Sequence, residues 1–187
     1  MENHVQTITS HLDKPLVMIG LMGAGKTKIG SLLAHTLNLP FIDADHEIEV
    51  SAGMSIADIF ETRGEPAFRD LERKVISRLM SDELKVIATG GGAVMNDQTA
   101  EVIWSKSISI WIKADLDVLV ERTSRNAKRP LLKNGNPRDI LQNLMTIRYP
   151  IYGQADLTVE TNTAEAEVTL QNLLGLLADY VAKEKVS

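Results

Sequence analysis

The feature that most constrains the fold of this chain is a glycine-rich segment near its N-terminal end. Residues 20–27 read GLMGAGKT, which matches the pattern G-x-x-x-x-G-K-[ST]. The apolar run PLVMIG leads into it, and apolar residues at helical spacing follow from Ile29 to Leu37. A strand, a glycine loop and a helix in this order cradle nucleotide phosphates. The segment therefore predicts a P-loop in which Lys26 reaches the phosphates and Thr27 ligates Mg²⁺.

The composition is that of an ordinary globular protein of one domain. The chain has 187 residues, of which 44% are hydrophobic and 24% charged, and its net charge is −5. An acidic balance argues against nucleic acid as the main partner. The absence of cysteine excludes disulfides, thiolate catalysis and zinc–sulfur sites.

The N-terminal segment lacks the features of a targeting signal. No apolar run approaches the roughly 20 residues of a membrane helix, and the start MENHVQTITSHLD has no apolar centre. We expect a cytoplasmic protein with a poorly ordered tail over residues 1–13 and a single folded domain over residues 14–187.

Short apolar runs alternate with segments of helical spacing along the rest of the chain. This alternation predicts an α/β fold with a parallel sheet covered on both faces. The predicted strands lie in PLVMIG, LPFIDAD, LKVIATGGG, SISIWIKAD and LTVE. Helices are expected after the P-loop, at 55–62 and 65–81, near 97–104 and 116–123, from about 138, and from about 164. The polar stretch from Thr123 to Pro137 is the one long loop, and such loops are usually functional or disordered.

A P-loop alone does not identify the class of protein. A GTPase needs a base-specificity element such as N-K-x-D, which is absent here. A motor ATPase needs a strand that ends in a clear metal-binding Asp, whereas VIAT ends in Gly90–Gly92. The chain is therefore better interpreted as a small-molecule kinase, and three further features point to an acceptor site.

The first feature is the pair Asp43 and Asp45, which ends the second predicted strand. In an extended backbone residues i and i+2 point the same way, so the two carboxylates should share a face at the carboxyl edge of the sheet. A cation or a hydroxyl-rich ligand would relieve their repulsion. The alternative is a helix N-cap or a solvated loop.

The other two features are charges on apolar helix faces. Glu72 falls inside an apolar arc of the helix at 65–81, with Arg69 at its edge, and Arg148 points into the apolar face of the helix from about 138. Two arginines suit a carboxylate ligand, and the nearby Gly90–Gly92 suit close approach of a ligand to backbone N–H groups. An ion pair, a solvated arginine head and a tight turn are the structural alternatives. Together these residues predict a small hydroxylated acid as acceptor.

The motifs GLMGAGKT, DAD, FRDLE, TGGGAV, RPLL and RYPIY occur in the order and approximate spacing of shikimate kinases, which the chain resembles over residues 16–160. The resemblance implies a three-layer α/β/α fold of the nucleoside monophosphate kinase type, with a five-stranded parallel sheet and a mobile lid at about 124–134. It also implies ATP-dependent phosphorylation of the 3-hydroxyl of shikimate, with Mg²⁺, in aromatic amino acid biosynthesis. We expect shikimate and ATP as the partners, and a monomer.

The resemblance implies a role for each matching residue. Asp45 would hold the substrate hydroxyls, Arg69 and Arg148 its carboxylate, and Arg129 would reach the ATP phosphates from the lid. Asp43 would lie near the metal through water, with Thr27 as its direct ligand, and Arg122 would lie by the adenine. Lys26, Asp45 and Arg129 are the expected catalytic residues. The ATP-binding set is Gly23, Ala24, Gly25, Lys26, Thr27, Lys28, Arg122 and Arg129, and the substrate-binding set is Asp45, Arg69, Glu72, Gly90, Gly91, Gly92 and Arg148.

Two other functions remain open at this point. One is a kinase of another sugar acid, such as gluconate, against which both arginine motifs count. The other is a non-enzymatic domain that senses shikimate or a nucleotide, against which the retention of Lys26, Thr27, Asp45 and Arg129 counts.

Overall fold

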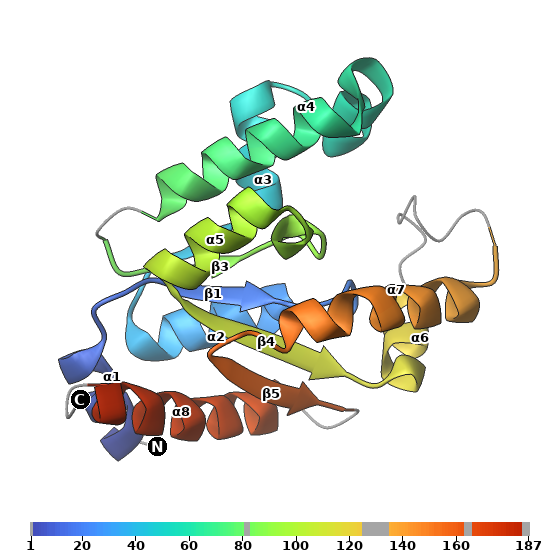
Figure 1. Cartoon of the computed structure of the whole chain (residues 1–187). Coiled ribbons are helices and arrows are strands. Elements are labelled where there is room, and N and C mark those ends of the chain that lie inside the picture. The colour runs from blue at the N-terminus through green and yellow to red at the C-terminus, as the bar shows by residue number, and fades with distance from the viewer. Residues whose placement is uncertain (1, 81–82, 125–134, 163–165, 185–187) are drawn as a thin grey trace.

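The computed structural model describes residues 2–80, 83–124, 135–162 and 166–184, and within them five strands form one parallel sheet (Figure 1). The strands are β1 (Leu16–Ile19), β2 (Phe41–Asp43), β3 (Val86–Ala88), β4 (Ile108–Ala114) and β5 (Leu157–Thr161). Their order across the sheet is β2-β3-β1-β4-β5. The predicted five-stranded parallel sheet is confirmed.

Helices follow each strand, as the alternation predicted. They are α1 (Glu2–His11), α2 (Lys26–Leu37), α3 (Ala44–Ala52), α4 (Ile56–Leu79), α5 (Asp97–Lys106), α6 (Leu116–Ser124), α7 (Pro137–Tyr152) and α8 (Ala166–Glu184), with a short 3₁₀ turn η1 (Ala93–Met95). Helix α2 packs on β1, β3 and α8, whereas α5 packs on β4 and α4. None of the described helices has the length and apolar content to span a membrane.

Helix α4 contains the two helical segments that the sequence predicted, joined at a kink. Gly64 there has φ 77° and ψ 171°, which is outside the helical region, and Ser55 caps the first segment by accepting from the backbone N–H of Asp58. The kink turns the second segment so that Phe68 and Glu72 face inward and are buried. In Figure 1 α3 and α4 project beyond the sheet as a separate lobe.

The expectation of a poorly ordered tail over residues 1–13 is wrong for the part that the structure describes. Residues 2–11 form α1, which packs on α8 and α2. The physical reason is an apolar stripe at helical spacing: Ile8 is 0% exposed, Leu12 is buried, and Val5 is half-buried beside them.

The carboxyl ends of β1, β2 and β3 meet at one edge of the sheet because the strands are parallel and in register. Met18 pairs with Ala88, and Ala88 with Asp43. The P-loop, the aspartate pair and the glycine triplet each follow one of these strands. They are therefore brought together by topology alone.

Candidate active site

The P-loop connects β1 to α2 in a conformation that its glycines make possible. Gly20 has φ 140° and Gly25 has φ 102°, and a Cβ on Gly20 would lie 2.6 Å from the backbone oxygen of Ile112. Gly25 is the N-cap of α2 and offers no capping side chain. The first turn of α2 is thus open to an anion.

Lys26 folds back over the loop that precedes it. Its ammonium donates to the carbonyl oxygens of Gly20 at 2.9 Å and Leu21 at 3.1 Å. This arrangement holds the charge at the mouth of the loop. Lys28 lies exposed in the same first turn of α2.

Thr27 and Asp43 lie together at the start of α2. The Thr27 hydroxyl donates to Oδ2 of Asp43 at 3.2 Å. A hydroxyl and a carboxylate oxygen are ligands that Mg²⁺ accepts, directly or through water. No cluster of three or more His, Asp or Glu among the described residues could hold a metal by itself, so this pair fits an ion that is held mainly by phosphate oxygens and water.

The expected strand geometry of Asp43 and Asp45 is wrong. Strand β2 ends at Asp43, and Asp45 lies in the first turn of α3. Oδ1 of Asp43 accepts from the backbone N–H groups of Asp45 at 3.1 Å and His46 at 3.5 Å, which makes Asp43 the N-cap of α3. Capping of otherwise unpaired N–H groups favours the helix here, so the two carboxylates do not share a strand face.

Asp45 nevertheless faces the glycine triplet. A Cβ on Gly90 would lie 2.8 Å from Oδ1 of Asp45. Burial raises the pKa of Asp45 above its ordinary value, and the negative charge of Asp43 adds to this, whereas Lys26 acts in the opposite direction. The carboxylate is therefore desolvated and close to the P-loop lysine.

Arg69 and Glu72 form an ion pair, which the sequence analysis left open as the structural alternative to a ligand site. Nη1 of Arg69 donates to Oε2 of Glu72 at 2.7 Å, and Glu72 is 1% exposed. Glu65, one turn earlier, also accepts from Arg69 at 3.2 Å. Burial raises the pKa of Glu72, and the charge and hydrogen bond of Arg69 oppose this shift.

The glycine triplet after β3 lies beside the charged side chains that are predicted to bind the acceptor. A Cβ on Gly92 would lie 2.8 Å from Nη2 of Arg69, and a Cβ on Gly91 would lie 3.4 Å from Nη1 of Arg148. With Asp45 and Glu72 beside Gly90, each glycine has at least one charged side chain beside it. Side chains here would displace those groups, so the absence of Cβ atoms is what lets them converge.

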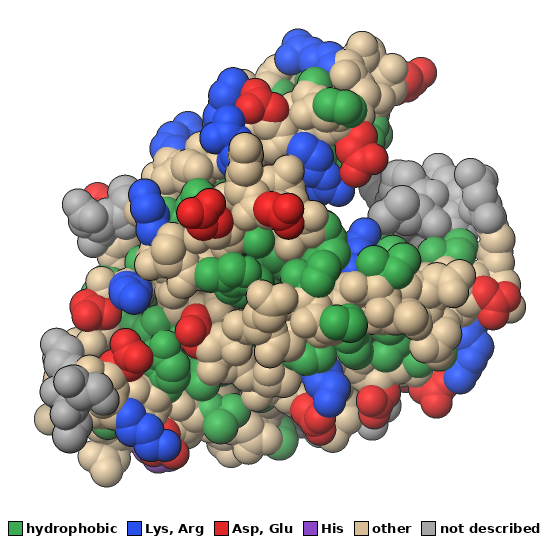
Figure 2. Space-filling view, viewed as in Figure 1, with side chains coloured by type: hydrophobic (Ala, Val, Ile, Leu, Met, Phe, Trp, Pro, Cys, Tyr) green, Lys and Arg blue, Asp and Glu red, His purple; other side chains and the backbone are tan. Residues whose placement is uncertain are grey.

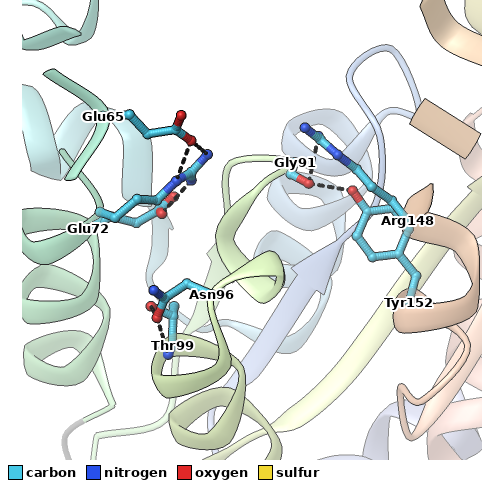
Figure 3. Close-up of polar contacts among 8 residues, drawn as sticks. Glu65, Glu72, Gly91, Asn96, Thr99, Arg148 and Tyr152 are labelled. Atoms are coloured by element: carbon cyan, nitrogen blue, oxygen red, sulfur yellow. Dashed lines mark hydrogen bonds and ion pairs between the residues drawn. The ribbon is translucent and has the colours of Figure 1, made fainter. Parts of the chain in front are cut away.

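Arg148 approaches the triplet from the other side, from α7 (Figure 3). Its Nη1 donates to the carbonyl oxygen of Gly91 at 3.0 Å, and the Tyr152 hydroxyl donates to the same oxygen. In the space-filling view the surface is hollowed between α4 and α7 (Figure 2). The two arginines thus reach one loop from opposite sides, and each can offer charge-assisted hydrogen bonds to a carboxylate.

Arg122 links the P-loop to the end of β5. Its guanidinium donates to the carbonyl oxygens of Ala24 at 3.2 Å and Asn162 at 2.5 Å, and to the Thr161 hydroxyl at 3.3 Å. Thr161 and Asn162 belong to the segment ETNTAE, which the resemblance matches only weakly. Arg129 and most of the expected lid lie outside the described residues.

Sequence reasoning missed three contributors to this site. Tyr152 was placed only on the apolar face of its helix, yet its spacing of four residues from Arg148 signals a shared direction. The same spacing separates Glu65 from Arg69. Thr161 could not be found this way because its partner Arg122 is 39 residues distant in the chain.

Comparison with known proteins agrees with this geometry. The family model for shikimate kinase matches residues 22–178. A shikimate kinase of Brucella canis is 50% identical over 188 residues, covering 100% of this chain and 94% of that protein. A solved structure, the shikimate kinase from Acinetobacter baumannii in complex with shikimate, has a TM-score of 0.86 and 37% identity, covering 92% of this chain and 97% of its own. A gluconokinase from Sinorhizobium meliloti has a TM-score of 0.61 and 17% identity, covering 94% of this chain and 98% of its own, which shows a common fold alone.

Proposed function

The chain belongs to the shikimate kinase family, and we propose that it transfers the γ-phosphoryl group of ATP to the 3-hydroxyl of shikimate. The products would be shikimate 3-phosphate and ADP, on the route to chorismate and the aromatic amino acids. The observation that carries this proposal is the pair Arg69 and Arg148 on either side of Gly90–Gly92, beside the P-loop. Such a site can hold a small carboxylic acid next to a bound nucleotide.

The nucleotide would lie along the P-loop. Backbone N–H groups of Gly23, Ala24 and Gly25 and the side chains of Lys26, Thr27 and Lys28 would surround its phosphates. Arg122, at the junction with Asn162, would border the adenine. Arg129 would complete the charge around the γ-phosphate.

Thr27 would ligate Mg²⁺, and Asp43 would hold one of its waters. Their 3.2 Å hydrogen bond shows that the two oxygens already lie together. Bound Mg²⁺ would bridge phosphate oxygens and offset their charge. Asp43 would keep its capping bonds to α3 in this role, since they use its other oxygen.

The acceptor would lie over the glycine triplet. Arg69 and Arg148 would bind its carboxylate, Gly91 and its neighbours would offer backbone contacts, and Asp45 would orient the hydroxyl that attacks. Glu72 fixes the direction of Arg69 through the 2.7 Å ion pair. Phosphoryl transfer depends mainly on positioning and charge, so orientation by Asp45 is the principal demand on that carboxylate.

We also propose a cytoplasmic enzyme, and the acidic net charge argues against a nucleic acid or an anionic membrane surface as its partner. The net charge of −5 gives no general attraction to phosphate backbones or anionic lipid. The described basic residues that are proposed to bind ATP or shikimate lie around the P-loop and the glycine triplet: Lys26, Arg69, Arg122 and Arg148.

A panel assay of ADP release tests the proposal. Shikimate should give Mg²⁺-dependent turnover, whereas gluconate should give none. The analogue with a ketone at carbon 3 keeps the carboxylate but lacks the acceptor hydroxyl, so it should inhibit competitively without turnover. Turnover of gluconate in place of shikimate would reject the assignment, and nucleotide binding without turnover of any acid would favour a sensing domain.

A further inference from the structure

One backbone oxygen in the acceptor site receives two donors from the same helix. The carbonyl of Gly91 accepts from Nη1 of Arg148 at 3.0 Å and from the hydroxyl of Tyr152, and both residues lie on α7, four residues apart (Figure 3). A carbonyl has two lone pairs, so both bonds can exist at once. The question is why this oxygen needs two donors.

The two donors differ in freedom. Tyr152 is 0% exposed, and its ring packs against Trp111 at 5.9 Å and Tyr149 at 6.2 Å between centroids. Burial raises the pKa of its hydroxyl to about 12, against the charge of Arg148 and a hydrogen bond from its guanidinium, so the hydroxyl remains a neutral donor at working pH. Arg148 is only half-buried and ends a long side chain. Tyr152 is therefore a fixed donor, and Arg148 can turn.

Arg148 has a second acceptor in the proposed function, the carboxylate of shikimate. A carboxylate binds an arginine best through two parallel N–H groups, which requires the guanidinium to face it. Turning in this way removes the donor at 3.0 Å from the Gly91 carbonyl. Without Tyr152, this movement would leave the partly buried Gly91 carbonyl with no donor, and the cost of that loss would oppose the movement.

We propose that Tyr152 is a positioning residue of the acceptor site, which keeps the Gly91 carbonyl paired when Arg148 turns to the carboxylate of the acceptor. The proposal rests on the function inferred above and adds a residue to it. Tyr152 never touches the substrate. It acts by lowering the energetic cost of releasing Arg148.

Tyr152→Phe tests this, with Tyr149→Phe as the matched control. Tyr149 lies on the same helix, its ring is 4.8 Å from Trp111, and its hydroxyl donates to the carbonyl of Ala114 at 2.5 Å. Each variant leaves one backbone oxygen with a donor fewer. Only Tyr152→Phe should raise the Kd and KM for shikimate, by about tenfold. The KM for ATP should stay within about twofold and kcat within about threefold in both variants.

A double-mutant cycle separates this role from general loss of structure. Arg148→Met keeps most of the side-chain stem but cannot donate, so no donor is released on binding. In that background Tyr152→Phe should change the KM for shikimate by less than about twofold. In addition, 4-aminophenylalanine at position 152 keeps a donor at the ring tip and should restore the KM to within about threefold of the wild-type value.

The outcomes distinguish the two levels of inference. A wild-type chain that does not turn over shikimate overturns both the proposed function and the role of Tyr152. An active wild-type enzyme in which Tyr152→Phe and Tyr149→Phe have equal effects, or in which the Tyr152 effect persists beside Arg148→Met, overturns the role of Tyr152 alone. Thermal midpoints measured in parallel show that each variant is folded.

Discussion

At the scale of single residues, the two arginines of the acceptor site are held in different ways. Arg69 is fixed by Glu72 and Glu65, whereas Arg148 contacts a backbone oxygen. Lysine at either position keeps the charge but loses the fork. Arg69→Lys and Arg148→Lys should each raise the KM for shikimate about ten- to a hundredfold, the value of a charge-assisted bond of about 1.5–3 kcal/mol.

Steady-state kinetics with each substrate varied in turn measures this effect. Arg73→Lys is the control, because Arg73 lies one turn further along α4 and forms an ion pair with Asp70 at 2.9 Å. It should leave both KM values unchanged. A rise in the KM for ATP alone would place the altered arginine in the nucleotide site.

The Asp45 carboxylate should be needed for activity but should lower the stability of the fold at neutral pH. Its pKa is raised from 3.8 by burial, so the folded chain binds this proton more tightly than the unfolded chain does. Ionisation therefore lowers the free energy of unfolding as the pH rises from about 3.8 through the raised pKa. Asp45→Asn removes this loss, and should melt above the wild type at pH 7 but not at pH 3.5.

The same substitution should lower kcat by about a hundredfold or more, since an amide cannot accept or orient the hydroxyl proton in the same way. Melting curves across pH 3.5–8, with kinetics at pH 7, measure both effects. An Asp45→Asn variant that is less stable than wild type at neutral pH would show that the carboxylate makes a net stabilising contact.

Single residues also show where sequence reasoning succeeded and failed. Glu72 and Arg148 were predictable because a charge within an apolar helical face has few explanations. The geometry of Asp43 was not, because the same aspartate can end a strand or cap a helix, and only the length of β2 decides between them. Tyr152 was overlooked because an aromatic residue on an apolar face normally needs no further explanation.

At the scale of elements, α4 depends on one backbone conformation. Gly64 lies at φ 77° and ψ 171°, a region that only glycine occupies freely, whereas Gly53 lies at φ 67° and ψ 19°, which other residues tolerate better. A Cβ would meet little at either position. Gly64→Ala should therefore cost about 2–3 kcal/mol and Gly53→Ala about 1 kcal/mol, from backbone strain alone.

Urea denaturation compares the two variants. Gly64→Ala should in addition raise the KM for shikimate, because the kink directs the second segment of α4, which carries Arg69, toward the triplet. Equal losses of stability in the two variants would show that α4 adapts to a straighter path.

Helix α1 is the element that the sequence analysis did not predict. Its polar residues suggested a tail, but Ile8 is 0% exposed beneath α8. Ile8→Ala should lower the free energy of unfolding by about 2–4 kcal/mol, whereas Gln6→Ala on the exposed face should change it by less than about 0.5 kcal/mol. Chemical denaturation measures both.

Activity provides the control for that experiment. Helix α1 packs mainly on α8 and α2, whereas the proposed acceptor residues lie on α3, α4 and α7 and after β3, so kcat/KM should stay within about twofold of wild type. A stability change below about 1 kcal/mol for Ile8→Ala would contradict its place in the core.

For the whole molecule, the fold class followed from alternation, but the order of strands did not. Short apolar strands separated by helices require parallel crossovers, which predicts the layers. The order β2-β3-β1-β4-β5 depends on which of the helical connections crosses over β1 to the other side of the sheet. Hydrophobic periodicity does not say which connection does so. The site could still be anticipated, since its motifs follow strand ends, and these meet at one edge in any such order.

The whole chain should be a monomer in solution. The exposed large apolar side chains among the described residues, Val50, Phe60, Ile147, Val168 and Leu176, are spread over four helices. Light scattering at micromolar concentration should give a mass near 20.6 kDa. A mass of twice that value would show that these side chains form a dimer interface.

The glycine triplet has a consequence for drug resistance. A Cβ on Gly90 would lie 2.8 Å from Oδ1 of Asp45, one on Gly92 2.8 Å from Nη2 of Arg69, and one on Gly91 3.2 Å from the backbone oxygen of Gly20. The side-chain ends of Asp45 and Arg69 could make room only by leaving the positions proposed to bind the acceptor. An inhibitor that occupies the carboxylate site would therefore face no simple escape at these three positions. A substitution that excludes the inhibitor would also displace a side chain that is proposed to bind the acceptor. The resistant enzyme would therefore lose its own activity.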